Sequence, residues 1–70
     1  MSSNELRQAI LAGEELRFSR RGREYLLYGW EQCDGYVLSL ECGEELVWQS
    51  APQARALCAE EFLGYLAENL

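Results

Sequence analysis

Apolar residues recur at helical spacing near the two ends of the chain and alternate with polar residues in between. Leu6 and Ile10 lie four positions apart, behind an S-x-x-E capping box formed by Ser2 and Glu5. Gly13 then supplies a left-handed stop. The pattern predicts a helix from about residue 3 to 12. A helix this short does not persist alone, so its apolar side chains are expected to pack on the rest of the domain.

The next stretch has the two-residue period of half-buried strands. Strands are expected over about 15–19 and 23–31, joined by a two-residue turn at Arg21-Gly22. The expected register pairs large apolar residues on one face, Leu16 with Leu27 and Phe18 with Tyr25.

Asp34-Gly35 is a strong hairpin signal and predicts a third strand over about 36–41. A turn at these two residues sets Trp30 opposite Ser39, and it sets Gly29 opposite Leu40. Gly29 is expected beneath a docked helix, where a missing side chain allows close approach. One face of the sheet, the core face, would then carry Leu16, Phe18, Tyr25, Leu27, Leu38 and Leu40.

A fourth strand is expected over about 45–49, and its register has two solutions. A three-residue turn at 42–44 puts Leu46 and Trp48 on the core face, whereas a two-residue turn puts Val47 there. The first solution is favoured because it buries the larger side chains.

The last segment, about 51–69, reads as helical. Ser50 is expected to cap it, with Pro52 in the first turn. An apolar stripe at four-residue spacing favours one continuous helix, and two short helices broken near 58–59 remain an alternative. The stripe consists of Ala54, Cys58, Phe62, Leu66 and Leu70. The chain is therefore predicted to be one α+β domain, with a four-stranded antiparallel meander and both helical segments packed mainly on one face.

Composition narrows the function classes. The 70 residues carry 12 acidic residues against six arginines and no lysine, a net charge of −6. This charge disfavours nucleic acid and anionic lipid as partners. No apolar stretch is long enough to span a membrane, and the polar start lacks the features of a secretory signal, so a cytoplasmic location is expected.

The chemistry of known catalytic and metal sites is missing from the sequence. Cys33, Cys42 and Cys58 are expected to be reduced thiols, because their number is odd and their spacing matches no zinc pattern. The chain has no histidine to activate a serine or cysteine. We therefore expect no enzyme activity, no cofactor and no metal.

Three surfaces are candidate contact sites. The first lies on the face of the sheet opposite the core face and comprises Leu26, Tyr28, Trp30 and Val37. The second is a basic hairpin tip with Arg17, Arg20, Arg21 and Arg23. The third is an acidic rim expected at the other end of the meander, with Glu31, Asp34, Glu41, Glu44 and Glu45.

The order of residues resembles small uncharacterised proteins of Gram-positive gut bacteria and their mobile elements. The run Glu15-Leu16-Arg17-Phe18 with Gly22 and Tyr25 is similar to their first hairpin, and Trp48-Gln49-Ser50 to their strand-to-helix junction. Leu57 and Phe62 match the two halves of their helical tail, although Cys58-Ala59 stands where those proteins have an Asp-Gly break. The resemblance implies a bacterial αββββα protein of unknown function.

The sequence thus predicts a small acidic binding module that acts by protein–protein contact. Two alternatives stay open. One is a structural domain that forms a homodimer through the outer sheet face. The other is a phage or mobile-element inhibitor whose acidic surface mimics nucleic acid.

Overall fold

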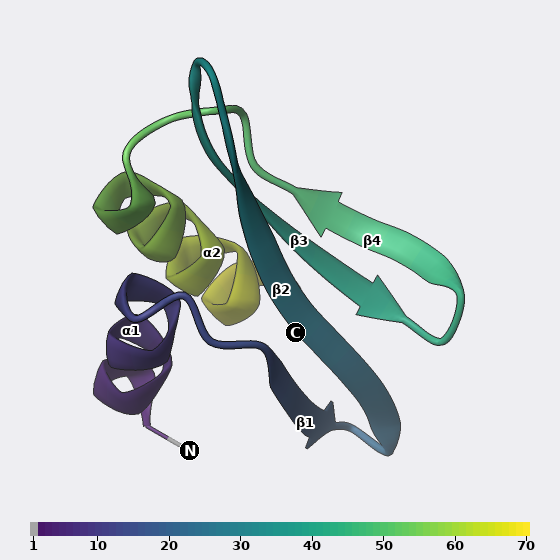
Figure 1. The fold of residues 1–70 in the computed structure, drawn as a ribbon. Coiled ribbons are helices and arrows are strands. Elements are labelled where there is room, and N and C mark those ends of the chain that lie inside the picture. Colours follow the sequence, from purple (N-terminus) through teal and green to yellow (C-terminus); the bar gives the residue numbers. More distant parts are fainter. Residues whose placement is uncertain (1) are drawn as a thin grey trace.

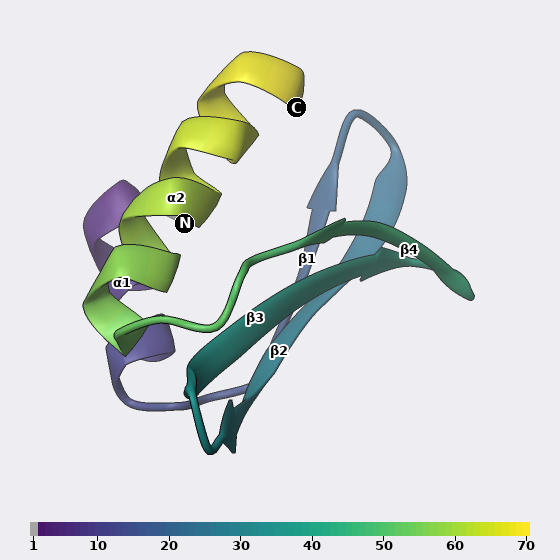
Figure 2. The ribbon, with the colours of Figure 1, turned by 90° about the horizontal axis from the view of Figure 1, so that it is seen from above.

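The computed structural model describes residues 2–70 and contains two helices and four strands. In chain order these are α1 (Ser3–Leu11), β1 (Leu16–Arg20), β2 (Arg23–Gln32), β3 (Gly35–Cys42), β4 (Glu45–Gln49) and α2 (Arg55–Asn69). The strands form one antiparallel sheet in the order β1-β2-β3-β4 (Figure 1). Both helices lie on the same side of the curved sheet (Figure 2). The predicted α+β class, with an antiparallel meander between two helices, is confirmed.

Local signals determine the first half of the fold. The capping box is present: the Ser2 amide donates to the Glu5 carboxylate at 3.0 Å, and the Glu5 amide donates to Ser2 Oγ at 3.2 Å. Gly13 has φ 77° and follows the last turn of α1. Leu6 and Ile10 are buried as expected.

The register of the first hairpin is also confirmed, with Leu16 opposite Leu27 and Phe18 opposite Tyr25. Arg21 and Gly22 both have positive φ, 52° and 75°, as the mirror-image turn of a two-residue hairpin requires.

The second hairpin differs from the prediction by two residues. Gln32 pairs with Gly35, so Cys33 and Asp34 form the turn, and Trp30 lies opposite Val37 rather than Ser39. Gly35 is needed for another reason, since a Cβ there would lie 2.5 Å from the backbone nitrogen of Gln53. A shift of two residues preserves the alternation of faces, so Leu38 and Leu40 still point into the core.

The environment predicted for Gly29 is wrong, because the ring of Tyr36 covers this position rather than a helix. Gly29 lies opposite Leu38, and a Cβ built on it would meet the Tyr36 hydroxyl at 2.3 Å. The Arg55 guanidinium packs over the Tyr36 ring, 4.5 Å from its centre.

The fourth strand combines both predicted registers through a β-bulge. Cys42 pairs with Glu45 across a two-residue turn and Leu46 lies opposite Glu41, but Leu40 pairs with Trp48. Val47 is the extra residue, and both Val47 and Trp48 pack against the core. The expectation that Leu46 is buried is wrong: Leu46 lies on the opposite face and is 50% exposed.

The last helix starts later than predicted and is unbroken. Ala54 is the N-cap of α2 and makes no side-chain capping bond, so Ser50 is not a cap and Pro52 lies outside the helix. Ser50 instead continues the strand pairing: its amide donates to the Leu38 carbonyl at 2.8 Å, and its hydroxyl accepts from the Leu38 amide at 2.9 Å. Ser50 and Gln53 therefore bond to β3, through Leu38 and Tyr36, and this holds the segment before α2 along the sheet.

The core lies between the sheet and the two helices. Phe62 on α2 is at its centre, with ring contacts to Phe18 and Trp48. Cys58 is fully buried, as expected, and its Sγ donates to the Tyr36 carbonyl at 3.2 Å. Within residues 2–70 no helix has the length and apolarity that a membrane crossing requires.

Candidate functional site: the outer sheet face

The face of the sheet turned away from the helices carries the first set of candidate residues. We call this surface the outer face and define it by Leu26, Tyr28, Trp30, Val37 and Leu46. Both helices are on the opposite side of the sheet (Figure 2), and no element of residues 2–70 covers the outer face.

Two aromatic side chains dominate the outer face. Tyr28 and Trp30 project from the same strand and stack, with ring centroids 5.9 Å apart. Trp30 is 37% exposed, and Tyr28 is half-buried. Stacking holds the Trp30 ring in one orientation, so its contact area is presented at little entropic cost.

Tyr28 is anchored at its polar end. Its hydroxyl donates to the Glu41 carboxylate at 2.5 Å, across the β2–β3 pair. This hydrogen bond raises the pKa of Tyr28 above its ordinary value, with burial a smaller cause. The anchored pair places a carboxylate at the margin of the aromatic surface.

The remaining outer-face residues add different amounts of accessible apolar area. Val37 lies directly opposite Trp30 and is only 3% exposed, so it supports the surface and adds little accessible area. Leu26 is half-buried and lies opposite Glu41, four residues before Trp30 on β2. Leu46 adds exposed apolar area, and sequence reasoning missed it because a bulge in β4 has no clear sequence signal.

The charged candidates are arranged differently from the prediction. Tyr25 pairs with Cys42, so the β1–β2 and β3–β4 turns lie at the same end of the sheet, while the β2–β3 turn lies at the other (Figure 1). The expected single acidic rim is therefore wrong. Glu31 and Asp34 lie at the β2–β3 end, and Glu41, Glu44 and Glu45 lie at the same end as the basic tip.

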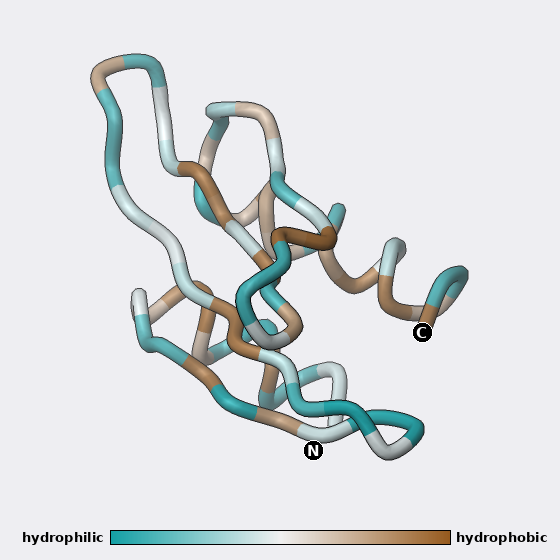
Figure 3. Tube along the Cα trace, turned by 90° about the vertical axis from the view of Figure 1, so that its right-hand side faces the viewer, coloured by the Kyte–Doolittle hydropathy of each residue, from teal (hydrophilic) through white to brown (hydrophobic). Residues whose placement is uncertain are grey.

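The four arginines of the predicted basic hairpin tip are divided between the two faces of the sheet: Arg20 and Arg23 pair on the core-facing side, whereas Arg17 lies opposite Leu26 on the outer face. Arg17, Arg20, Arg21 and Arg23 are all exposed, and none forms an ion pair with another of residues 2–70. Figure 3 shows hydrophilic colour around this turn and hydrophobic colour along the middle of the strands. The other two arginines are paired, Arg7 with Glu60 and Arg55 with Glu31.

The three free thiols lie in different environments: Cys33 is exposed, Cys42 is half-buried and Cys58 is buried. The buried Cys58 thiol donates to the Tyr36 carbonyl, and its Sγ lies 3.4 Å from Ser50 Oγ. These contacts indicate a structural role in packing α2 on the sheet. Within residues 2–70, no three Cys, Asp or Glu side chains are grouped so that they could hold a metal ion.

No protein-family model, curated protein or solved structure matches the chain. The resemblance to proteins of gut bacteria and mobile elements therefore stays a prediction.

Proposed function

We propose that this protein is a small acidic binding module that contacts another protein through its outer face. The observation that supports the proposal is the stacked Tyr28–Trp30 pair, held on a four-stranded sheet and left uncovered by both helices. Exposed tryptophan and tyrosine rings on a rigid support are typical of the energetic centre of protein interfaces.

The chemistry of the surface indicates the partner. The apolar centre is flanked by two carboxylates, Glu24 and Glu41, and by one cation, Arg17, which lies opposite Leu26, while the chain has a net charge of −6. A partner with basic side chains around an apolar patch would therefore be attracted and oriented. The five acidic candidates are divided between the two ends of the sheet and do not form the single rim that nucleic-acid mimicry was expected to use, so we propose protein contact instead. We also propose a cytoplasmic location, which the exposed thiol of Cys33 supports because such thiols survive in reducing compartments.

The test compares three forms of the tagged protein in affinity capture from bacterial lysate. These are the unmodified chain, a Tyr28→Ser/Trp30→Ser variant, and a Leu57→Ser control that removes an apolar side chain, 55% exposed, from α2. A protein retained by the unmodified chain and the control, and lost with the double variant, supports the proposal. Circular dichroism checks that all three forms are folded.

Two results would contradict it. One is a set of captured proteins that does not depend on Tyr28 and Trp30. The other is a stable dimer in light scattering that the double variant converts to monomer, since the outer face would then be occupied by a second copy of the chain.

A further inference from the structure

The edge of β2 is open along the half of the strand that β1 does not cover. β2 spans Arg23–Gln32, whereas its pairing with β1 ends where Leu16 lies opposite Leu27. Figure 1 shows β2 continuing past the start of β1 toward the β2–β3 turn. We call this uncovered stretch, residues 28–32, the open edge. It includes both aromatic residues of the outer face.

The hydrogen bonds of β3 determine where the main-chain groups of the open edge point. Tyr36 and Leu38 each use both their N–H and their C=O on residues 50–53, at 2.8–3.1 Å. Residues that lie opposite each other in an antiparallel pair either exchange two hydrogen bonds or direct their groups away from each other. Glu31, opposite Tyr36, and Gly29, opposite Leu38, therefore direct their N–H and C=O away from β3.

These donors and acceptors of the open edge have no hydrogen-bonding partner within residues 2–70. The loop from α1 to β1 forms no main-chain hydrogen bond with Gly29 or Glu31, and Glu31 is bound only through its carboxylate. Glu31 is exposed and Gly29 is half-buried. Because glycine has no side chain, the exposed part of Gly29 is main chain. Unpaired main-chain groups at a strand edge are a template for pairing with another strand.

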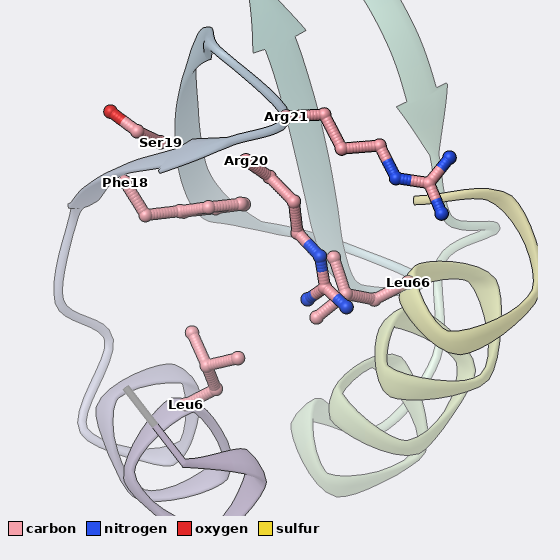
Figure 4. Close-up of a pocket in the computed structure, with 6 residues that line it drawn as sticks. All are labelled: Leu6, Phe18, Ser19, Arg20, Arg21 and Leu66. Atoms are coloured by element: carbon pink, nitrogen blue, oxygen red, sulfur yellow. The ribbon is translucent and has the colours of Figure 1, made fainter.

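The two outermost strands of the sheet are protected against such pairing. β1 carries the exposed charges of Arg17 and Arg20, and Figure 4 shows the Arg20 side chain extending from the strand toward the helices. β4 has a bulge at Val47, whose carbonyl accepts a hydrogen bond from the Tyr65 hydroxyl at 3.5 Å. Edge charges and bulges both discourage strand addition. The open edge has no bulge, and the carboxylate of its charged residue, Glu31, is already ion-paired.

We infer that the partner adds an extended peptide segment to the open edge, antiparallel to β2 and in line with β1. The inference rests on the proposed function, since it names the part of the partner that lies beside Trp30. Segment residues opposite Gly29 and Glu31 would exchange main-chain hydrogen bonds with them. The segment residue opposite Trp30 would place its side chain on the outer face, against a ring that is 37% exposed.

The charges around the open edge favour a basic segment. Glu15 lies next to the start of β1 and Asp34 lies in the β2–β3 turn; both are exposed, and neither is ion-paired within residues 2–70. Between them, Glu31 pairs with Arg55, and Arg17 lies on β1, outside the open edge. Carboxylates at both ends of the open edge would attract and orient a segment with lysine or arginine beside its apolar residue.

The test uses a short peptide, acetyl-Lys-Lys-Val-Thr-Val-amide, in two N-methylated forms. In the proposed register its second and fourth residues face Glu31 and Gly29, and its central valine faces Trp30. Methyl groups on the second and fourth amides block the side that would bond to β2, whereas methyl groups on the third and fifth amides lie on the side that points away. The two forms are matched in charge and number of methyl groups, so a difference between them reports strand pairing.

Binding is followed by NMR of the ¹⁵N-labelled protein. The form methylated on its third and fifth amides should cause saturable shifts at the amides of residues 28–32, and added salt should weaken its binding. The form methylated on its second and fourth amides should bind at least about tenfold more weakly, because it loses two hydrogen bonds and brings methyl groups against the strand. In hydrogen exchange, the amides of Gly29 and Glu31 should exchange rapidly in the free protein and slow down when the first form is bound.

Variants of the protein locate the bound peptide. Trp30→Ser should weaken binding of the first form about fivefold or more, because the central valine loses its cross-strand contact. The matched Leu46→Ser removes a side chain that is 50% exposed on the same face but lies on β4. This control should leave binding within about twofold.

The inference is overturned by absence of saturable shifts, by equal binding of the two methylated forms, or by equal effects of Trp30→Ser and Leu46→Ser. None of these results contradicts the proposed function, which depends on whether captured proteins require Tyr28 and Trp30. Capture that does not depend on those two residues would contradict the proposed function whatever the peptides show.

Discussion

Replacing Gly29 with alanine tests the cross-strand packing in the middle of the sheet. A Cβ at this position would lie 2.3 Å from the Tyr36 hydroxyl and 2.4 Å from the ring carbon that carries it. Tyr36 is buried and packs against the Arg55 guanidinium, so its ring cannot move aside without losing that contact. An aromatic ring that covers a cross-strand glycine is a known way of stabilising such a position.

Two opposing effects set the magnitude. Alanine in a strand is favoured over glycine by about 0.5–1 kcal/mol, because glycine loses more backbone freedom on folding. Forcing an extra carbon into a packed site costs about 1–3 kcal/mol. We therefore expect Gly29→Ala to lower the free energy of unfolding by about 1–2 kcal/mol. In a domain of this size the melting temperature should fall by about 4–8 °C for each kcal/mol.

The assay is urea denaturation of four proteins: the unmodified chain, Gly29→Ala, Tyr36→Leu and the double variant. Leucine lacks the ring atoms that the new Cβ would meet, so Gly29→Ala should be neutral or stabilising by about 0.5–1 kcal/mol in the Tyr36→Leu background. The sign of the effect thus reverses between backgrounds. If Gly29→Ala has the same effect with tyrosine and with leucine at position 36, the reasoning is refuted.

Three further predictions concern individual polar side chains. Arg55→Gln should destabilise the protein by about 1–2 kcal/mol in urea denaturation, because the guanidinium contacts the Leu11 carbonyl, Glu31 and the Tyr36 ring. The control Arg7→Gln, which removes one exposed ion pair, should have a smaller effect. Ser50→Ala should cost about 1–3 kcal/mol and speed hydrogen exchange in β3, because a buried strand amide loses its acceptor. In ultraviolet titration, Tyr28 should ionise at a higher pH than free tyrosine, and Glu41→Gln should shift this pKa downward. The raised pKa makes the contribution of Tyr28 to stability complete below the ordinary tyrosine pKa, and it should be lost as pH rises through the folded value.

The sequence predicted those parts of the fold that depend on local signals. The capping box at Ser2 and Glu5 and the turn at Arg21-Gly22 satisfy backbone groups within a few residues, so nearby side chains suffice to indicate them. The second hairpin was misplaced by two residues, because Gly35 resembles a turn residue. It is required instead by the backbone of residue 53, far away in the sequence. The predicted faces survived, since an even shift leaves every side chain on its original side.

The errors near the second half of the chain share one physical cause. Ser50, two residues before Pro52, is of a residue type typical of a helix N-cap, yet its hydroxyl and its amide both bind Leu38 on β3. Tyr36 likewise forms a two-bond bridge with Gln53, so the segment before α2 is held along the sheet. These are contacts between distant residues, and a local pattern cannot show which partner a serine hydroxyl will choose.

The same distinction explains how far the candidate sites could be predicted. Strand alternation placed Tyr28 and Trp30 on the face opposite the core, and alternation also puts Arg20 on the core side, two residues after Phe18. An arginine at a core-facing position is a signal that sequence reading can detect. The side chains that meet beside Arg20 include Leu6 and Leu66 from distant parts of the chain, and their meeting depends on α1 packing against α2. Strand alternation therefore indicates which face of the sheet a residue occupies, and the tertiary packing of the helices decides what lies next to it.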